Sequence, residues 1–509
     1  MLFVLARMRG IISSHISPGS KTCVVVGPIE GVAGLDLGGY ASVLWFASGA
    51  APVSSGCLGA GLGKVTVEAV EKLDANHTIE VLDELIQRDA LHMPSIVVTE
   101  GVSNASSRFF PQVIDAIFAQ FESHRGARFF RQQQGFPTQF NVLTNLPAYV
   151  RRRMPGSWAG ALDGIPAFVC GAGPSLDASA AKLKEFAQFG VIFATDSALT
   201  ALDRLGIPAD FALAVDPRKA PANCLSPGGL QPGRLMLASA SLPAWRQAVA
   251  EDRMCFLSGR QLTEDWLAGN GIQKTATGVT ESCGATAFEL ALHLGCRPLC
   301  LFGMDHAVDS QDTTRWHHQD FSSGLQQQLY RPRGLDLPKV PGNFQDEIAT
   351  PFFREWRVLD ARCAGLPAGR LLNVTDRGAR LRNTTVVRPG DFSVDDHSRK
   401  KTAHLARLAQ AESIPEPDFR RMFDTIRRVA VAARPAVAEA REALRQGKRK
   451  HVADLLIQSF AHEPFCRLMG NYCLKVIPHL LGSEGVDDNQ WSQLVTETEE
   501  LLGVAENLR

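Results

Sequence analysis

Residues 166–217 read PAFVCGAGPSLDASAAKLKEFAQFGVIFATDSALTALDRLGIPADFALAVDP. This stretch contains three apolar runs, at Ala167–Cys170, Val191–Ala194 and Phe211–Val215, and helix-forming residues fill the two intervals between them. Strands that alternate with helices are typical of a parallel sheet with right-handed crossovers. The stretch therefore predicts a βαβαβ unit within a doubly wound, Rossmann-like α/β domain with a mostly parallel sheet.

The segments that follow this unit repeat the pattern more loosely. Their spacing predicts a strand at Met254–Leu257, a helix at Gly284–Leu294 and a buried strand at Pro298–Phe302. A long segment with weak periodicity comes next, and such segments inside a domain are often functional lids. A helix and a further strand are expected after it, at Phe352–Ala364 and Arg370–Val374.

The regions on either side differ in composition from this α/β stretch. The N-terminal region mixes strand-like runs with helical stretches such as Val67–Arg88, and Phe140–Pro166 is typical of a connector. Past Asp396, Ala, Arg, Glu and Leu recur at helical spacing. The sequence thus predicts three domains: an N-terminal α/β domain (1–140), a central doubly wound α/β domain (141–390) and an all-helical domain (391–509).

Composition narrows the classes of function. The 509 residues are enough for about three domains. Because 53 basic residues balance 53 acidic ones, no global positive charge favours nucleic acid. Eleven cysteines without a CxxC pair fit a reducing compartment, and neither a signal peptide nor a membrane span is evident. We expect a cytoplasmic protein.

The loop Gly171–Ser175 (GAGPS) directly follows the first predicted strand and precedes a helix. Glycine lets the backbone approach a ligand, and the N–H groups and dipole at a helix start attract phosphate. The loop is not a GxGxxG fingerprint, because Leu176 stands where glycine is needed, and no Walker A lysine follows. The pattern indicates a phosphate site, with close packing of strand against helix as the alternative.

Aspartates follow three of the predicted strands, at Asp196, Asp216 and Asp305. The carboxyl ends of parallel strands converge on the crevice where ligands bind, and a carboxylate after the second strand often holds ribose hydroxyls. We therefore expect the three side chains to share one site with the loop Gly171–Ser175. For each aspartate, a helix N-cap is the alternative.

Hydroxyl and imidazole side chains supply further candidates. Thr280 and Ser282 precede a predicted helix, where they are either a second ligand position or ordinary caps. His306, His317 and His318 lie in the long irregular segment, and histidine is the natural general base near neutral pH. Because a His pair without a third ligand at known spacing is not typical of a metal site, no metal ligands are predicted.

Five motifs, in order, resemble a known family. They are FVCGAGPSLD, FATDSALTALDRLGIPADFALAVDP, GCRPLCLFGMDHA, VPGNF and NVTDRGARLRNT, and they lie between Asn141 and Thr385. The set is similar to the domain shared by motility-associated-factor (Maf) flagellin glycosyltransferases and 6-hydroxymethylpterin diphosphokinase MptE-like proteins. The Maf group is favoured, because the chain also has a large N-terminal region, the connector FNVLTNLPAYVRRR and the helical C-terminal region.

The GAGPSL loop and the later GxD with its lid histidine also resemble bacterial CMP-sialic acid transferases. This resemblance implies that Asp196 holds the nucleotide or sugar, Asp305 anchors the site, and either His317 or His318 is the base. The residues that it assigns to the nucleotide phosphate are Gly171, Gly173, Pro174 and Ser175. Asn373, Thr375, Gly378 and Ala379 match the NxTxxGA element of the Maf-like family, which implies that they close the site on the sugar side.

The resemblance implies a glycosyltransferase that moves a nonulosonic acid (sialic, pseudaminic or legionaminic type) from a CMP-activated donor to Ser or Thr of flagellin or another surface protein. Arg218, Lys219 and Arg315 are expected near the anionic donor, and no cofactor is expected. One alternative is a diphosphokinase that uses ATP and Mg²⁺ held by Asp196, Asp216 or Asp305. The other is a non-catalytic nucleotide-binding protein.

Overall fold

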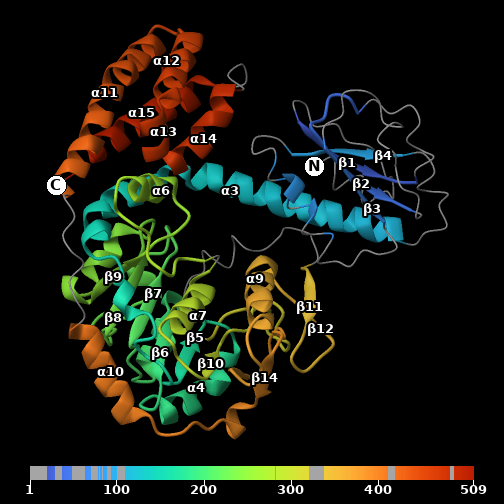
Figure 1. The fold of residues 1–509 in the computed structure, drawn as a ribbon, viewed down its shortest axis with the longest axis vertical. Coiled ribbons are helices and arrows are strands. Elements are labelled where there is room, and N and C mark those ends of the chain that lie inside the picture. Colours follow the sequence, from blue (N-terminus) through green and yellow to red (C-terminus); the bar gives the residue numbers. More distant parts are fainter. Residues whose placement is uncertain are drawn as a thin grey trace. The chain divides into compact units, whose positions relative to one another are not determined.

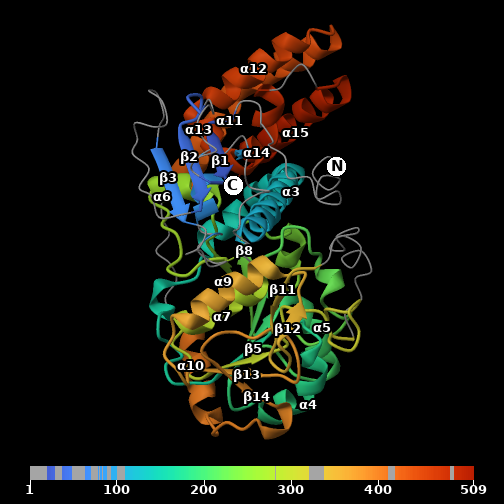
Figure 2. The ribbon, with the colours of Figure 1, turned by 90° about the vertical axis from the view of Figure 1, so that its right-hand side faces the viewer.

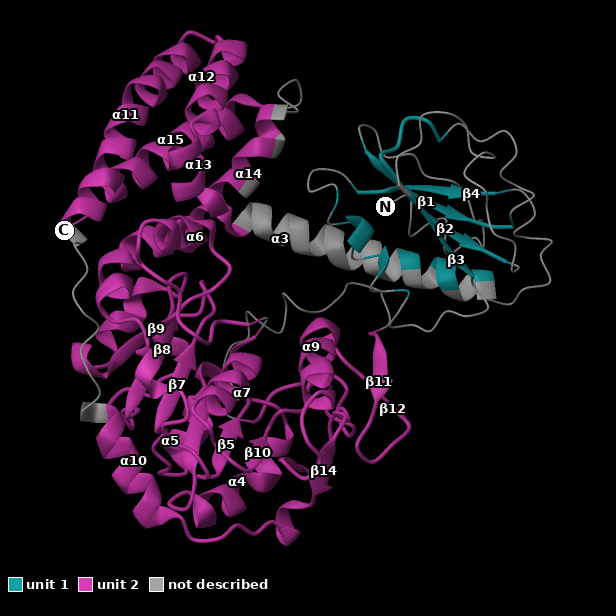
Figure 3. Ribbon diagram, in the orientation of Figure 1, with its two compact units in different colours: residues 1–133 teal, residues 134–509 magenta. Residues whose placement is uncertain are grey.

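The computed structural model divides into two compact units, residues 1–133 and 134–509 (Figure 3). The domain boundaries predicted at residues 140 and 390 are not tested by this division and stay predictions. The described residues are 20–28, 37–48, 64–69, 78, 81–82, 84–86, 88, 93–99, 109–280, 282–319, 337–410, 419–481 and 486–508.

The first unit holds a four-stranded parallel sheet in the order β3-β2-β1-β4. Its strands are β1 (Thr22–Val26), β2 (Ser42–Ala47), β3 (Lys64–Ala69) and β4 (Ser95–Val98). The helix predicted at Val67–Arg88 is wrong at its start, because KVTVEA alternates apolar and polar side chains with the period of a strand. Much of the rest of that predicted helix lies outside the described residues.

The second unit is built on an eight-stranded parallel sheet in the order β14-β13-β10-β5-β6-β7-β8-β9 (Figure 1). The predicted doubly wound α/β fold is thereby confirmed. Its strands are β5 (Ala167–Cys170), β6 (Val191–Thr195), β7 (Phe211–Ala214), β8 (Arg234–Ala238), β9 (Met254–Leu257), β10 (Leu299–Phe302), β13 (Leu371–Val374) and β14 (Thr384–Val387). The chain reverses direction across the sheet between β5 and β10, and ligands of such sheets bind at this switch point.

Side chains alternate between two apolar cores on the faces of this sheet. In β5, Phe168 and Cys170 enter one core and Ala167 and Val169 enter the other. The first core includes α4 (Ser175–Phe186) and α5 (Leu199–Arg204), and the second includes α7 (Cys283–His293) and α9 (Phe353–Ala364). These layers can be followed in Figure 2. Because both faces are covered, the strands read as continuous apolar runs.

The long helix α3 (Phe109–Arg151) corrects the prediction of a connector that begins at Phe140. Pro137 and Pro147 lie inside the helix. Two polar residues that are typical of loops hydrogen-bond instead to backbone carbonyls at the sheet edge: Asn141 Nδ2 donates to Ala240 O at 3.0 Å and Asn145 Nδ2 to Ser241 O at 2.7 Å. These tertiary hydrogen bonds explain why polar residues that are typical of loops lie within a helix here.

The C-terminal region is helical, as predicted. Helix α10 (Ser398–Gln410) has Leu405 and Leu408 in the second core, and α11 packs against α12 and α15. The helices from α11 onward are α11 (Phe419–Arg445), α12 (Arg449–Ala461), α13 (Glu463–Leu468), α14 (Gly470–Leu481) and α15 (Asp488–Glu506). Among the described helices, none is long and apolar enough to cross a membrane.

Candidate active site

The loop between β5 and α4 hydrogen-bonds to the segment that follows β10. The N–H groups of Gly171 and Gly173 donate to Phe302 O and Gly303 O, each at 2.8 Å. The Ser175 N–H donates to Asp305 Oδ2 at 2.7 Å, and Pro174 has no N–H. These N–H groups already have protein acceptors, so phosphate binding by this loop stays a prediction.

Asp305 joins three segments through its buried side chain and backbone. Its Oδ2 accepts from Ser175 N–H at 2.7 Å, its Oδ1 from Thr375 Oγ1 at 3.4 Å, and its carbonyl from Ala379 N–H at 2.8 Å. Burial raises the pKa of Asp305 to about 6, against the hydrogen bonding from Ser175. Through the bond to the Ser175 N–H, the carboxyl group lies at the start of α4, where the helix dipole stabilises an anion. Asp305 thus anchors the site through contacts with Ser175, Thr375 and Ala379. Its direct catalytic role stays a prediction.

The glycines around Asp305 permit close contact between loops. A Cβ at Gly171 would lie 2.5 Å from Gly303 O, and one at Gly173 would lie 2.7 Å from the same oxygen. Gly378 has a φ of 86°, and its Cβ would lie 2.7 Å from Asp305 Oδ1. The close-packing alternative for the glycine loop thus accounts for these positions without a ligand.

Asp196 follows β6 and forms a buried ion pair. Its Oδ1 accepts from Lys219 Nζ at 2.9 Å and from Ser197 N–H at 2.6 Å. Burial alone would lower the pKa of Lys219, but the charge of Asp196 outweighs it and the pKa is raised. Lys219, expected to meet an anionic donor, therefore has a carboxylate partner in this structure.

Three buried polar atoms without a hydrogen-bond partner lie at the carboxyl ends of β5 and β6. They are Ser175 Oγ, Thr195 Oγ1 and Asp196 Oδ2, and the exposure of the three residues is 0%, 5% and 2%. An unsatisfied buried polar atom costs about 1–3 kcal/mol, so such atoms mark a place that a ligand or water completes. The sequence interpretation missed Thr195, although it directly precedes Asp196.

The start of α7 approaches the same edge of the sheet. Cys283 Sγ donates to Leu213 O of β7 at 2.8 Å, and a Cβ at Gly284 would lie 3.9 Å from Thr195 Cγ2. Ser282 Oγ accepts from Ala285 N–H at 3.2 Å, and Thr280 Oγ1 lies 3.2 Å from Thr286 Oγ1. Ser282 thus caps α7, the alternative given for it, whereas Thr280 contacts Thr286 in the first turn of that helix; the sugar-side role of both stays a prediction.

The two neighbouring histidines have different contacts. His318 is buried; its N–H donates to Ala172 O at 2.9 Å, and its Nε2 lies 2.8 Å from Ser197 O, so that nitrogen must donate. His317 is half-buried and packs edge-on against Phe352. Burial, with the nearby charges of Lys219 and His318, lowers the pKa of His317 to about 3. Both histidines therefore lie near the Asp196–Lys219 pair, and His318 connects the ends of β5 and β6.

Other predicted site residues are placed less centrally. Asp216 Oδ1 accepts from Arg218 N–H at 2.8 Å, close to the end of β7. Asn373 lies within β13, in register with Leu301 of β10, and is buried. Thr375 Oγ1 donates to Arg377 O at 2.8 Å besides its contact with Asp305. Their predicted roles toward nucleotide and sugar are not tested by these contacts.

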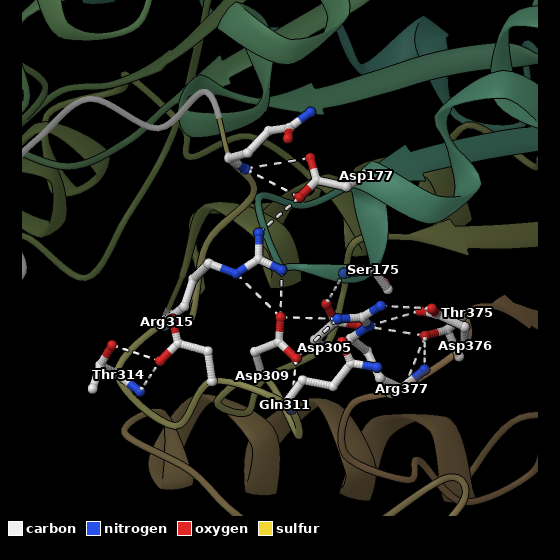
Figure 4. A network of polar contacts seen from close by, with 12 residues as sticks. Ser175, Asp177, Asp305, Asp309, Gln311, Thr314, Arg315, Thr375, Asp376 and Arg377 are labelled. Atoms are coloured by element: carbon white, nitrogen blue, oxygen red, sulfur yellow. Dashed lines mark hydrogen bonds and ion pairs between the residues drawn. The ribbon is translucent and has the colours of Figure 1, made fainter.

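A network of charges connects the segment after β10 to α4 and to the loop after β13 (Figure 4). Arg315 bonds to Asp177 of α4 at 3.0 Å and to Asp309 at 3.1 Å. Arg377 Nη1 donates to both oxygens of Asp309, Oδ1 at 2.9 Å and Oδ2 at 2.8 Å, and Arg377 Nη2 donates to Asp376 Oδ2 at 2.7 Å. Arg315, expected near an anionic donor, is thus held between two carboxylates. No group of three or more His, Cys, Asp or Glu that could hold a metal occurs among the described residues.

The second unit is therefore a doubly wound α/β protein with its polar, partly unsatisfied site at the carboxyl edge of the sheet. Residues 140–311 match the family model described as 6-hydroxymethylpterin diphosphokinase MptE-like. The chain is also similar to the structure of MAf glycosyltransferase from Magnetospirillum magneticum AMB-1, with a TM-score of 0.51 and 15% identity over 96% of this chain and 78% of that one. At this identity the likeness shows the fold, and no curated protein sequence matches the chain.

The comparisons bear out the resemblance stated from the motifs. The family match spans β5 to β10, and hence the loop Gly171–Ser175, Asp196 and Asp305. The structural likeness extends beyond residues 140–311 to almost the whole chain. An MptE-like segment is thus contained within a larger fold of the Maf type.

Proposed function

We propose that the protein is a glycosyltransferase that transfers a nonulosonic acid from a CMP-activated donor to Ser or Thr of flagellin or another surface protein. The observation that carries this proposal is the fold likeness to a MAf glycosyltransferase over 96% of the chain. It includes the helices α11–α15 and the N-terminal sheet, which lie outside the MptE-like match at 140–311. A compact diphosphokinase would lack most of these parts.

The donor is proposed to bind against the ends of β5 and β6. Asp196 Oδ2 is an acceptor without a partner, and hydroxyl or amino groups of the nucleoside are the donors that would satisfy it. Thr195 Oγ1 has no partner and would donate to an oxygen of the ligand. The Lys219 ammonium pairs with the other oxygen of Asp196 at 2.9 Å and neutralises its charge, so that an anionic sugar phosphate would not be repelled there.

His317 is proposed as the general base. At neutral pH its imidazole is uncharged, because burial, Lys219 and His318 lower its pKa. It would remove the proton of the acceptor hydroxyl while the oxygen attacks the anomeric carbon and CMP leaves with the bonding electrons. An anionic donor beside Lys219 would offset that positive charge and raise the pKa of His317. His318 would act as a positioning residue, because its ring holds Ser197 O.

The runner-up function is transfer of diphosphate from ATP to a hydroxymethylpterin. The match of residues 140–311 to the 6-hydroxymethylpterin diphosphokinase MptE-like family model favours it. This reaction needs Mg²⁺ to neutralise the phosphates, with Asp196, Asp216 or Asp305 as ligands. Both oxygens of Asp305 accept protein hydrogen bonds, from Ser175 and Thr375, whereas Asp196 Oδ2 has no partner. Asp196 is therefore the carboxylate closest to this role.

The test is CMP release from CMP-activated sialic, pseudaminic and legionaminic acids, with and without purified flagellin, followed by the intact mass of the flagellin. We expect acceptor-dependent CMP release without added Mg²⁺, and its loss in Asp196→Asn. The matched control is Asp252→Asn, because Asp252 is exposed and lies outside the site. ATP consumption that requires Mg²⁺ and a pterin, without CMP release, would establish the runner-up instead.

A further inference from the structure

Two cysteines far from the candidate active site face each other across the junction of α13 and α14. Cys466 Sγ and Cys473 Sγ are 3.6 Å apart. The S–H of Cys473 also lies 3.3 Å from the carbonyl of Cys466, so it can turn to either acceptor. A disulfide needs a sulfur–sulfur distance of about 2.0 Å, and a small side-chain rotation would close the gap.

Cys466 differs from the other cysteines of the described chain in exposure and acidity. Of the ten described cysteines, only Cys283 and Cys466 are not fully buried. The hydrogen bond from Cys473 lowers the pKa of Cys466 to about 7, whereas burial raises that of Cys283. A half-buried thiol with a lowered pKa is partly thiolate at neutral pH, and the thiolate is the reactive form. Cys473, only 2% exposed, lies behind it as the second thiol.

The turn between the two cysteines is where these helices contact α6 (Leu262–Gly269) and α3. The carbonyl of Leu468 accepts from Gln139 Nε2 and from Thr263 Oγ1, each at 2.9 Å. The N–H of Asn471 donates to Gln139 Oε1 at 3.0 Å. The sulfur pair therefore lies beside the joint that attaches the C-terminal helices to the α/β part of the second unit.

We propose that Cys466 and Cys473 form a reactive dithiol that a peroxide converts into an intramolecular disulfide. The Cys466 thiolate attacks the peroxide oxygen, the O–O bond breaks, and a sulfenic acid and water form. The Cys473 sulfur then attacks the sulfenic sulfur, so that the S–S bond forms, the S–O bond breaks and a second water leaves. The two sulfurs together lose two electrons, which reduce the peroxide.

The sequence makes this disulfide easy to detect, because Arg467 lies between the two cysteines. The full-length protein is treated with hydrogen peroxide, its free thiols are alkylated, and trypsin is added without reductant. Cleavage separates Cys466, in His451–Arg467, from Cys473, in Leu468–Lys475. We expect these two peptides joined, at the sum of their masses less two hydrogens, and released by dithiothreitol.

Variants separate the proposed pairing from general thiol oxidation. Cys473→Ser should abolish the joined peptides, while Cys283→Ser, which removes the other partly exposed thiol among the described cysteines, should leave them unchanged. The rate of iodoacetamide alkylation at Cys466 should be half-maximal at about pH 7 and shift toward the ordinary thiol value of 9.0 in Cys473→Ser. Because the joined peptides are sought in the wild-type protein, that measurement does not depend on the folding of a variant.

Either of two results would overturn the proposal. One is oxidation of the two cysteines to separate sulfinic or sulfonic acids with no joined peptides in the wild-type protein. The other is an alkylation profile of Cys466 that is the same in the wild type and in folded Cys473→Ser, because the second thiol would then not influence the first.

Discussion

Two stretches of the carboxyl edge of the large sheet can be compared directly. Between β5 and β10, at the switch point, the loops are filled by glycine contacts and by the Asp305 carboxyl group, whose oxygens accept from Ser175 and Thr375. In front of β5 and β6, Ser175 Oγ, Thr195 Oγ1 and Asp196 Oδ2 are buried and unsatisfied. Thus the backbone N–H groups of Gly171, Gly173 and Ser175 have protein partners without a ligand, whereas the side-chain oxygens beside them do not.

The difference shows that glycines and unsatisfied polar atoms carry different information. A glycine after a strand indicates that another group lies close to the backbone, and here that group is Gly303 or Asp305. A buried oxygen without a hydrogen-bond partner indicates a position that a ligand or a water molecule completes. The second kind of observation favours placing the proposed donor site toward β6, beside Lys219 and the two histidines.

The largest expected effect separates His317 from His318. His317→Ala should reduce the rate of sugar transfer by about 10²–10⁴-fold, the usual contribution of a general base, with an unchanged melting temperature. His318→Ala should destabilise the protein by roughly 1–3 kcal/mol, because Ser197 O and the ends of β5 and β6 lose a buried hydrogen bond.

Activity assays and urea unfolding of both variants check this pair. A His317→Ala variant that is fully active would remove His317 as the base. A His318→Ala variant that keeps its stability but loses only catalysis would transfer the base role to His318.

The next effect tests whether the switch-point loops are closed by packing. Gly173→Ala would place a Cβ 2.7 Å from Gly303 O and against the Asp305 carboxylate, so we expect a loss of about 3 kcal/mol or more in the free energy of unfolding. Gly156→Ala is the control, since no atom lies within 4 Å of its added Cβ. Equal stabilities of the two variants in urea would show that the loops are open enough for a ligand to enter there.

The sequence allowed much of the fold to be predicted, for a physical reason. Strands such as β5, β6 and β10 are buried on both faces, so their apolar runs are unmistakable. The end of α3 was misread, because Pro147 and Asn145 are typical of loops and their helical environment depends on tertiary contacts. Strand β8 was missed, although RLMLA is a clear apolar run.

The site was only partly predictable. Asp196 could be placed at the edge of the sheet, because it follows a predicted strand. Its pairing with Lys219, and that of Asp305 with the Ser175 N–H across 130 residues, depend on how distant segments meet. The different environments of His317 and His318 likewise depend on the path of the segment after β10.

A third effect uses pH to test the enclosed carboxyl of Asp305. Its pKa of about 6 exceeds the ordinary value of 3.8, so between these values the folded state binds more protons than the unfolded state. Stability should fall as pH rises from about 4 to 6, by roughly 2–3 kcal/mol from this group. Asp305→Asn should lack that component, which the difference between the wild-type and variant unfolding curves isolates. A flat difference would mean that Asp305 is solvated.

The smallest effect tests whether the proposed donor site extends to the start of α7. Ser282→Ala removes the N-cap acceptor of Ala285 N–H, so we expect a loss of about 1 kcal/mol in stability. Ser282→Gly also removes the hydroxyl, but glycine caps helices well, and the loss should be only a few tenths of a kcal/mol. Because the hydroxyl is already engaged as a cap, we expect KM for the donor in Ser282→Gly to equal that of the wild type. A raised KM at unchanged stability would instead place the Ser282 hydroxyl on the donor. The unsatisfied stretch would then continue from β6 to α7, and the contrast with the closed switch point would become sharper.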